Sequence, residues 1–199
     1  MHLAPLASPP AGSVSAALTA IGSEITATLG VFAGTDAAGE LDRAADELLR
    51  ARRVFLLGAG RSGLALQMTA MRLMHLGLTA HVVGEATAPA IESGDLLLVA
   101  SGSGTTPGIV HAAQTASEVG ASVVAITADA ASALALVSTV AIVVPAARKL
   151  DRDSAASAQY AGSLFEQSVV VVGDALFHAI WTASDLTADD LWPRHSNLE

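Results

Sequence analysis

The sequence has no cysteine, a single lysine (Lys149) and few aromatic residues, which make up 4% of its 199 positions. Without cysteine it can form no disulfide, no thiolate metal site and no cysteine nucleophile. Charged residues amount to 15%, and the net charge of −9 argues against a general nucleic-acid-binding surface. We therefore expect no nucleic-acid partner, and an anionic ligand would have to be held largely without lysine.

We also expect neither a signal peptide nor a membrane span. No basic segment precedes an apolar run at the N-terminus, and three prolines fall within the first ten residues. The longest apolar stretch, residues 164–181, is interrupted by Glu166 and Asp174, which a bilayer would disfavour. We predict a buried helix there, no membrane partner and a cytoplasmic location.

Small and aliphatic residues dominate what is present. Hydrophobic residues make up 52% of the chain, and 199 residues suffice for one domain with an ample core. Because aromatic residues are scarce, that core has to be built mainly from alanine, valine and leucine, which suits closely packed layers of helix on sheet. The low charge content leaves apolar surface that needs cover, so we expect a homo-oligomer, either a dimer or a tetramer.

An alternation of strands and helices begins at residue 53. Continuous apolar runs predict five strands, at residues 54–57, 79–83, 96–100, 122–126 and 140–144. Helices are predicted at residues 62–76, 107–119, 131–137 and 162–184. Continuous rather than alternating apolar runs are typical of parallel strands that are covered on both faces. The predicted fold is α/β, a single-domain three-layer sandwich with a five-stranded parallel sheet flanked by helices.

The N-terminal part is predicted to be helical and to precede this domain. Residues 13–29 and 40–52 carry apolar residues at helical spacing, and three glycines within residues 30–39 indicate a turn between them. We expect residues 1–39 to form a tail and a helical arm, and residues 40–199 to form the functional domain.

A glycine turn, Gly58-Ala-Gly-Arg-Ser-Gly63, follows the first predicted strand with the G-x-G-x-x-G spacing of a dinucleotide fingerprint. That fingerprint also needs an acidic residue at the end of the second strand, which Glu85 could supply. Against it, Arg61 and Ser62 put polar side chains where bare backbone usually meets a pyrophosphate. Arg61 and Ser62 are instead candidates to bind sugar hydroxyls or phosphate, and a structural ion pair is the alternative for Arg61.

A hydroxyl-rich loop, Ser101-Gly-Ser-Gly-Thr-Thr106, follows the third predicted strand and leads into a helix. Hydroxyls and backbone N–H groups at a helix N-terminus can hold a small anion by hydrogen bonds and the helix dipole. The predicted phosphate-binding residues are Ser101, Ser103, Thr105 and Thr106. The alternative is a helix cap with a flexible approach loop, but four hydroxyl residues in six positions are more than a cap requires.

These two loops, which follow two strands of the predicted sheet, resemble those of the sugar isomerase (SIS) domain family, which has a flavodoxin-like fold. Four further strings narrow the resemblance to its 6-phospho-3-hexuloisomerases: residues 71–77 (MRLMHLG), 82–85 (VVGE), 162–167 (GSLFEQ) and 194–199 (RHSNLE). The likeness extends over roughly residues 40–199. Many members carry glutamate where this chain has Thr105, so a role assigned to that acid does not carry over.

The resemblance implies interconversion of 3-hexulose 6-phosphate and fructose 6-phosphate in the ribulose monophosphate pathway of formaldehyde fixation, with no metal or cofactor. Moving the carbonyl from C3 to C2 takes a proton from C2, passes through an enediol and returns a proton to C3. One carboxylate above that edge can make both transfers. Our candidate is Glu166, near the start of an otherwise apolar helix; the alternative is an acid placed there only by the helix dipole.

Two histidines complete the predicted site. His195, in the polar C-terminal segment, is expected to move protons between substrate oxygens, and because such tails are mobile we expect it to complete a neighbouring subunit's site. The alternative for His195 is a surface histidine. His75 lies on the same helical stripe as Leu64, Met68 and Met71. It is therefore either a hydrogen-bonded core residue or a substrate-binding residue at a subunit boundary.

Two other functions stay open at this point. A non-catalytic phosphosugar-binding regulator would use the same hydroxyl loop but would not need Glu166. Such regulators usually carry a DNA-binding segment, for which the first 52 residues have too few basic side chains. Another isomerase of the same fold, such as one acting on arabinose 5-phosphate, is the second alternative.

Overall fold

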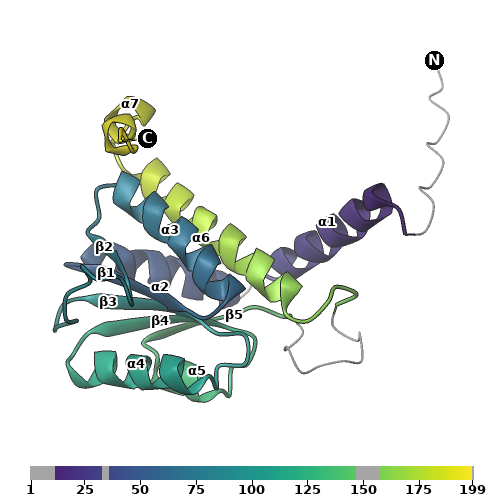
Figure 1. The fold of residues 1–199 in the computed structure, drawn as a ribbon, viewed down its shortest axis with the longest axis horizontal. Helices are drawn as coiled ribbons and strands as arrows, with labels where there is room; N and C mark the ends of the chain where they lie inside the picture. The colour runs from purple at the N-terminus through teal and green to yellow at the C-terminus, as the bar shows by residue number, and fades with distance from the viewer. Residues whose placement is uncertain (1–11, 33–35, 147–156, 199) are drawn as a thin grey trace.

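A parallel five-stranded sheet in the order β2-β1-β3-β4-β5 forms the middle layer of the protein (Figure 1). Its strands are β1 (Val54–Gly58), β2 (Ala80–Val82), β3 (Leu96–Ala100), β4 (Ser122–Thr127) and β5 (Val140–Val143). The computed structural model describes residues 12–32, 36–146 and 157–198. The predicted α/β fold is confirmed, and the strands begin and end within one residue of the predicted positions.

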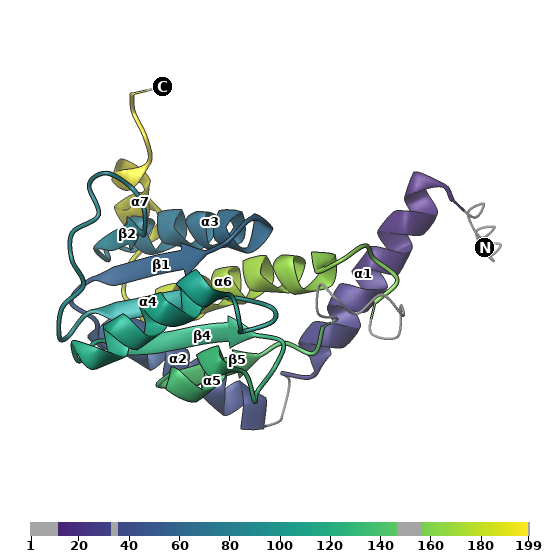
Figure 2. The ribbon, with the colours of Figure 1, turned by 60° about the horizontal axis from the view of Figure 1, so that its bottom comes forward.

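Helices cover both faces of the sheet (Figure 2). One face carries α2 (Asp36–Arg50), α3 (Arg61–His75) and α6 (Ser163–Ala183), and the other carries α4 (Pro107–Glu118) and α5 (Ala133–Val137). Successive residues of a strand enter different cores. Leu98 belongs to the apolar cluster shared with α3 and α6, and Leu97 to the one shared with α4. Both faces are therefore buried, which explains the continuous apolar runs.

Two segments lie outside these layers. Helix α1 (Val14–Gly30) extends away from the body beside the start of α6 (Figures 1 and 2). Near the C-terminus, α7 (Ala188–Leu191) and a 3-10 turn (Trp192–Arg194) form a folded segment where the sequence predicted only a polar tail. A capping box of Thr187 and Asp190 starts α7. The domain boundary at residue 39 stays a prediction, and residues 1–11 of the expected tail lie outside the described residues.

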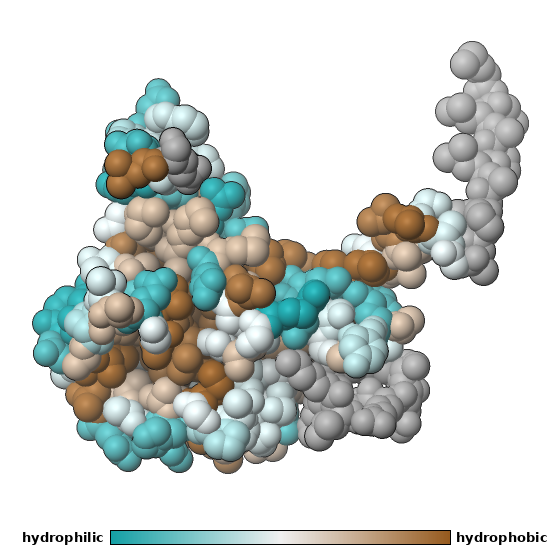
Figure 3. All heavy atoms as spheres, viewed as in Figure 1, coloured by the Kyte–Doolittle hydropathy of each residue, from teal (hydrophilic) through white to brown (hydrophobic). Residues whose placement is uncertain are grey.

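The apolar stripe of α3 faces outward. Leu64, Met68 and Met71 are 61%, 51% and 56% exposed, whereas Leu66 and Leu73 are buried against the sheet. Helix α3 is apolar on two faces and the sheet can cover only one of them, so the other stays on the surface. Apolar residues are visible on the surface over α3 and α6 in Figure 3. This stripe is a candidate contact with a second protein molecule.

Helix α6 is the long apolar helix that the sequence predicts to be buried. By length and composition it could cross a membrane, but half of its most apolar stretch is buried inside the protein. It packs closely on α3, because a Cβ on Gly173 would collide with Thr69 Oγ1. The position of α6 against α3 fixes its first turn near the loop that follows β1.

Candidate functional site

The two predicted ligand loops leave neighbouring strands at the same edge of the sheet. Strands β1 and β3 pair in parallel, with Gly58 opposite Ala100, so loop 59–63 and loop 101–106 begin side by side. From β1 the chain proceeds to one side of the sheet, and from β3 to the other. Ligands of open α/β sheets bind at such a switch point, beyond the carboxyl ends of the strands.

The first loop is closed by contact between two glycines. A Cβ on Gly58 would lie 2.7 Å from Gly63 N, and one on Gly63 would lie 2.5 Å from Gly58 O. Gly60 has a φ of +58°, which residues with a side chain rarely adopt. The G-x-G-x-x-G spacing is thus explained by a tight turn alone. This turn exposes Arg61 at the mouth of the loop and buries Ser62 in the first turn of α3.

The second loop carries a connected set of hydroxyls. Ser101 Oγ and Thr106 Oγ1 lie 3.2 Å apart. Ser103 Oγ accepts hydrogen bonds from Thr105 N and Thr105 Oγ1, at 3.3 and 3.2 Å, so its own hydroxyl hydrogen can be donated to a ligand. Gly104 N donates to Ser101 O at 3.0 Å and closes the turn. Thr106 occupies the N-cap position of α4 without a side-chain capping bond, so its hydroxyl does not serve as a cap.

The first turn of α6 closes the site from a third direction. Phe165 packs on the second loop, where a Cβ on Gly102 would lie 3.3 Å from Phe165 Cδ1. The next residue, Glu166, has a side chain that is only 6% exposed. Its Oε2 accepts a hydrogen bond from Arg61 Nε at 2.5 Å. Three segments that are distant in sequence therefore meet at one edge of the sheet.

This arrangement suits proton transfer on a phosphorylated substrate. Hydroxyls and the N-terminus of α4 can hold a phosphate monoester by hydrogen bonds, and the exposed guanidinium of Arg61 adds one positive charge beside them. Glu166 supplies a carboxylate with little access to water. Within the described ranges, no three histidine, aspartate or glutamate side chains are placed to hold a metal ion.

The structure does not bring the two predicted histidines to this edge. His75 is 3% exposed at the C-terminal end of α3, and its ring stacks on His195 with centroids 4.0 Å apart. Trp192 packs on His195, with the two ring centroids 4.7 Å apart. Arg194 holds this segment in place by donating from Nη1 to His75 O at 2.9 Å. Burial lowers the pKa of His75, and His195, Arg72 and Arg194 lower it further.

The length of α3 separates the two groups. The helix has 15 residues, with Arg61 at its start and His75 at its end, so about 20 Å lies between them. A cavity of about 490 Å³ opens beside the histidine end and is lined by Arg72, Asp174 and His195 among others. His75 Nδ1 is buried and has no hydrogen-bond partner among the described residues. His195 therefore cannot reach Glu166 of its own chain.

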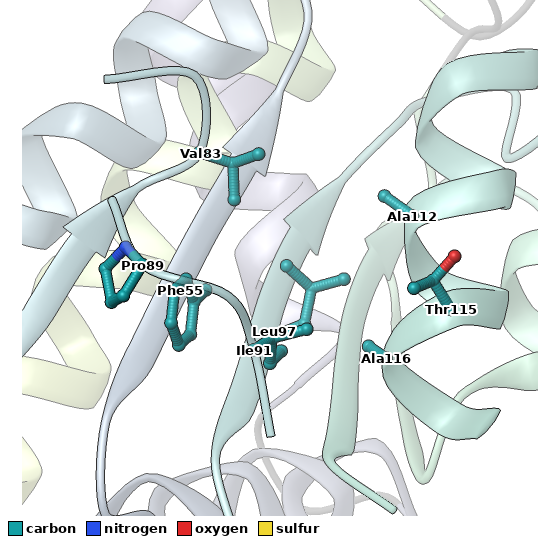
Figure 4. Close-up of a pocket in the computed structure, with 8 residues that line it drawn as sticks. All are labelled: Phe55, Val83, Pro89, Ile91, Leu97, Ala112, Thr115 and Ala116. Carbon is teal, nitrogen blue, oxygen red and sulfur yellow. The ribbon is translucent and has the colours of Figure 1, made fainter. Parts of the chain in front are cut away.

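A second cavity has no part in the candidate site. It has a volume of about 220 Å³ and lies between the sheet, α4 and the segment after β2 (Figure 4). Phe55 and Leu97 form its floor, and Ile91 and Ala116 stand at its sides. Its lining is apolar, with Thr115 as the polar exception, so it offers nothing that would bind a phosphate group.

Sequence reasoning missed two contacts that define these groups. It named Arg61 and Glu166 separately but could not pair them, because 105 positions separate them. It also missed Trp192, whose contact with His195 orders the C-terminal segment. The sequence did carry a signal that the C-terminal segment is folded. The segment begins with a capping box, and an aromatic residue stands three positions before the histidine.

The geometry agrees with what comparisons with known proteins find. The model of the SIS domain matches residues 47–172. A 3-hexulose-6-phosphate isomerase of Mycobacterium gastri is 47% identical over 95% of this chain and 98% of its own length. The Bacillus subtilis enzyme of the same name is 37% identical over 80% of this chain and 87% of its own length.

A solved structure extends the similarity to three dimensions. The crystal structure of a hypothetical protein of Methanococcus jannaschii, for which a 3-hexulose-6-phosphate isomerase function has been inferred, superposes with a TM-score of 0.78. It is 28% identical in sequence, and the match covers 92% of this chain and 99% of that one.

Proposed function

The chain belongs to the SIS domain family, and from that premise we propose that it is a 3-hexulose-6-phosphate isomerase, which interconverts 3-hexulose 6-phosphate and fructose 6-phosphate. The observation that carries this proposal is the position of Glu166. Its buried carboxylate stands beside the hydroxyl loop at the switch point between β1 and β3. A regulator that only binds phosphosugars has no use for a carboxylate in that place.

The phosphate group anchors the substrate at loop 101–106. Ser103 donates its free hydroxyl hydrogen to the phosphate. When the phosphate binds, Ser101, Thr105 and Thr106 turn their hydroxyls toward it from the bonds that they make within the loop, and the backbone N–H groups at the start of α4 add their dipole. Arg61 contributes the nearby positive charge. Ser62, buried at the start of α3, supports the same end of the ligand.

Glu166 performs the proton transfers in this proposal. Its carboxylate takes the proton from C2 of 3-hexulose 6-phosphate, which gives an enediol between C2 and C3, and returns a proton to C3. Arg61 already donates to Glu166 Oε2. When the substrate binds, the exposed end of Arg61 can turn toward the phosphate, and the carboxylate then faces the carbon atoms. The reaction has no net redox change, because C2 is oxidised as C3 is reduced: protons leave C2 and its oxygen, and protons arrive at C3 and its oxygen.

A second copy of the chain completes the site. The exposed stripe of Leu64, Met68 and Met71 runs along α3 between the Arg61 end and the His75 end. If two copies pack these stripes together about a two-fold axis perpendicular to α3, their α3 helices run antiparallel. Each Arg61 end then meets the other copy's His75 end, and His195 of the second copy is available to move protons between the substrate oxygens. The stripe and the separated half-sites both support a homodimer or a tetramer built from such dimers.

Localisation and pathway follow from the same activity. We propose a cytoplasmic enzyme of the ribulose monophosphate pathway, where a synthase that fixes formaldehyde supplies the 3-hexulose phosphate. The net charge of −9 supports the absence of a nucleic-acid partner.

The experiment supplies purified protein with 3-hexulose 6-phosphate and measures the appearance of fructose 6-phosphate. Glu166→Gln should lower kcat by about a hundredfold to ten-thousandfold, because the amide cannot accept the proton. Glu118→Gln, the same change at an exposed acid at the C-terminal end of α4, is the control. Turnover of arabinose 5-phosphate in preference to 3-hexulose 6-phosphate would refute the substrate, and an active Glu166→Gln variant would refute the mechanism.

A further inference from the structure

Helix α1 places one carboxylate against the segment that leads into α6. Glu24 Oε2 accepts from Ser157 Oγ at 2.8 Å and from Gln159 Nε2 at 2.9 Å. Glu24 Oε1 accepts from Ala158 N at 2.7 Å. One side chain thus accepts from three consecutive residues that lie at least 133 positions away in sequence. We call these four residues the Glu24 clamp.

The clamp continues into the helix that carries Glu166. Gln159 Oε1 accepts a hydrogen bond from Gln167 Nε2 at 2.9 Å, so a chain of hydrogen bonds runs from Glu24 through Gln159 to the neighbour of Glu166. Gln159 N also donates to Ser157 Oγ at 3.0 Å, which holds the segment in its turn. The hydrogen bond from Gln159, followed by that from Ala158, lowers the pKa of Glu24, so its carboxylate is charged at neutral pH.

The turn between the clamp and α6 contains a residue in an unfavourable backbone conformation. Ala161 has a φ of +53°, a conformation that residues with a Cβ rarely adopt. Gly162 then occupies the N-cap position of α6 without a side-chain cap, and Ser163 Oγ donates to Tyr160 O at 2.8 Å. Because Ala161 is in an unfavourable conformation, contacts from outside help to keep this turn, and Glu24 supplies a charged one at residues 157–159 just before it.

We propose that Glu24 is a positioning residue for Glu166, because its clamp fixes where α6 begins. This rests on the proposed function, in which Glu166 carries the proton. The first turn of α6 also sets Phe165 against Gly102 of the phosphate-binding loop. A shift at residues 157–162 would therefore move the carboxylate relative to the bound phosphate. Helix α1, which the sequence assigns to a separate arm, then belongs to the catalytic apparatus.

The first test removes the acceptor and separates turnover from binding. Glu24→Ala should lower kcat by about tenfold to a hundredfold, the effect of a displacement of about 1 Å at a reacting group. KM should stay within about threefold, because the phosphate-binding loop is not part of the clamp. Asp42→Asn, which removes one negative charge from an exposed position on α2, is the charge-matched control and should match the wild type.

The second test exchanges the donor and the acceptor in the hydrogen bond between Gln159 and Glu24. Gln159→Glu alone places two carboxylates face to face and should lower kcat at least as far as Glu24→Ala does. In the double variant Glu24→Gln with Gln159→Glu, the amide introduced on α1 donates to the carboxylate introduced opposite it, which still accepts from Gln167 Nε2. We expect that variant to recover most of the lost kcat, as a coupled pair does in a double-mutant cycle.

A third variant tests whether Glu24 positions Glu166 or only attaches α1 to the rest of the protein. Leu29 packs α1 against the apolar core without touching the clamp, so Leu29→Ala should lower the melting temperature and leave kcat unchanged. The proposal is overturned if Leu29→Ala lowers kcat as Glu24→Ala does. It is also overturned if Glu24→Ala keeps wild-type kcat, or if the double variant recovers the melting temperature without kcat. A wild-type protein that lacks isomerase activity would refute the proposed function, and this inference with it.

Discussion

At the carboxyl edge of the sheet, a loop of hydroxyls can still donate to a ligand, whereas at the amino edge charged side chains are paired with one another. Strand β3 has one end at each edge. Its carboxyl end runs into Ser101, whose hydroxyl lies 3.2 Å from Thr106 Oγ1 in a loop of further hydroxyls. Its amino end follows Asp95, which Arg53 Nη2 contacts at 2.6 Å and Arg52 Nε at 3.2 Å. The carboxyl edge therefore has hydroxyl donors that a ligand can use, and at the amino edge the charge of Asp95 is already paired.

Helix α3 extends this difference to the proposed catalytic groups. It runs antiparallel to the strands, so Arg61 lies at the carboxyl edge with Glu166, and His75 lies at the amino edge with His195. Neither edge has both halves of the proposed acid–base set. In the proposed mechanism a single chain is therefore an incomplete enzyme, and its exposed α3 stripe has the place and the length to bring the two edges of different copies together.

The largest effect is expected when the proposed catalytic residues of the two edges, Glu166 and His195, are replaced in separate chains. Glu166→Gln and His195→Ala should each lower kcat by about a hundredfold or more when assayed alone. When both variants are unfolded together and refolded, half of the dimers pair unlike chains, and one of their two sites has both residues. The mixture should regain about a quarter of the wild-type activity. A mixture no more active than its components would mean that His195 does not act across a subunit boundary.

The α3 stripe itself gives the next largest effect. Met68→Lys puts a charge at its centre and should convert the assembly to monomers, measured by light scattering after gel filtration. Because the histidine end of a second copy is then lost, kcat should fall by about a hundredfold. Leu136→Lys, at an exposed position of α5 on the opposite side of the sheet, is the control and should keep both assembly and activity. A fully active Met68→Lys monomer would show that one chain suffices.

What the sequence predicts well is local in origin. The strands are continuous apolar runs because both faces of the sheet are covered, and such runs are visible without knowledge of their partners. The two ligand loops are equally local, since glycines at Gly58 and Gly63 and the hydroxyls at 101–106 serve a short turn. Their positions at one edge follow from parallel pairing of neighbouring strands.

The sequence predicts two kinds of feature poorly. One depends on contacts between residues that are far apart in the chain, and the other on which of two similar apolar faces of a helix is buried. Arg194 holds the C-terminal segment to His75 O across 119 positions, so a tail that looks polar and irregular is folded. The outward face of α3 could not be predicted, because Leu64 and Leu66 are equally apolar and only packing decides which is buried. The contact of Glu24 with residues 157–159 has no local signal at all.

A smaller effect is expected from a single donor at the carboxyl edge. Ser103→Ala removes a hydroxyl that accepts from Thr105, which leaves its own hydrogen for the proposed phosphate. A hydrogen bond to a charged group contributes about 1.5 to 3 kcal/mol, so KM should rise by about tenfold to a hundredfold, with kcat within about threefold. Ser117→Ala, near the far end of α4, is the matched control. A KM equal to that of the wild type would remove Ser103 from the phosphate-binding set.

The ion cluster of Asp95 with Arg52 and Arg53, at the amino edge, should affect stability and leave turnover unchanged. Burial raises the pKa of Asp95, but hydrogen bonds from Arg53, Glu92 N and Arg52 outweigh it and lower the pKa to about 2. Since the folded pKa is below the unfolded one of 3.8, the charged group stabilises the fold above pH 4, and this contribution is lost as the pH falls toward 2. The loss should reach about 2 kcal/mol, measured by urea unfolding from pH 5 downward. Asp95→Asn, less stable at neutral pH, should lack this part of the pH dependence, whereas Asp46→Asn at an exposed position should keep it. An identical slope in Asp95→Asn would mean that other carboxylates cause the loss, and that this ion cluster does not hold the amino edge.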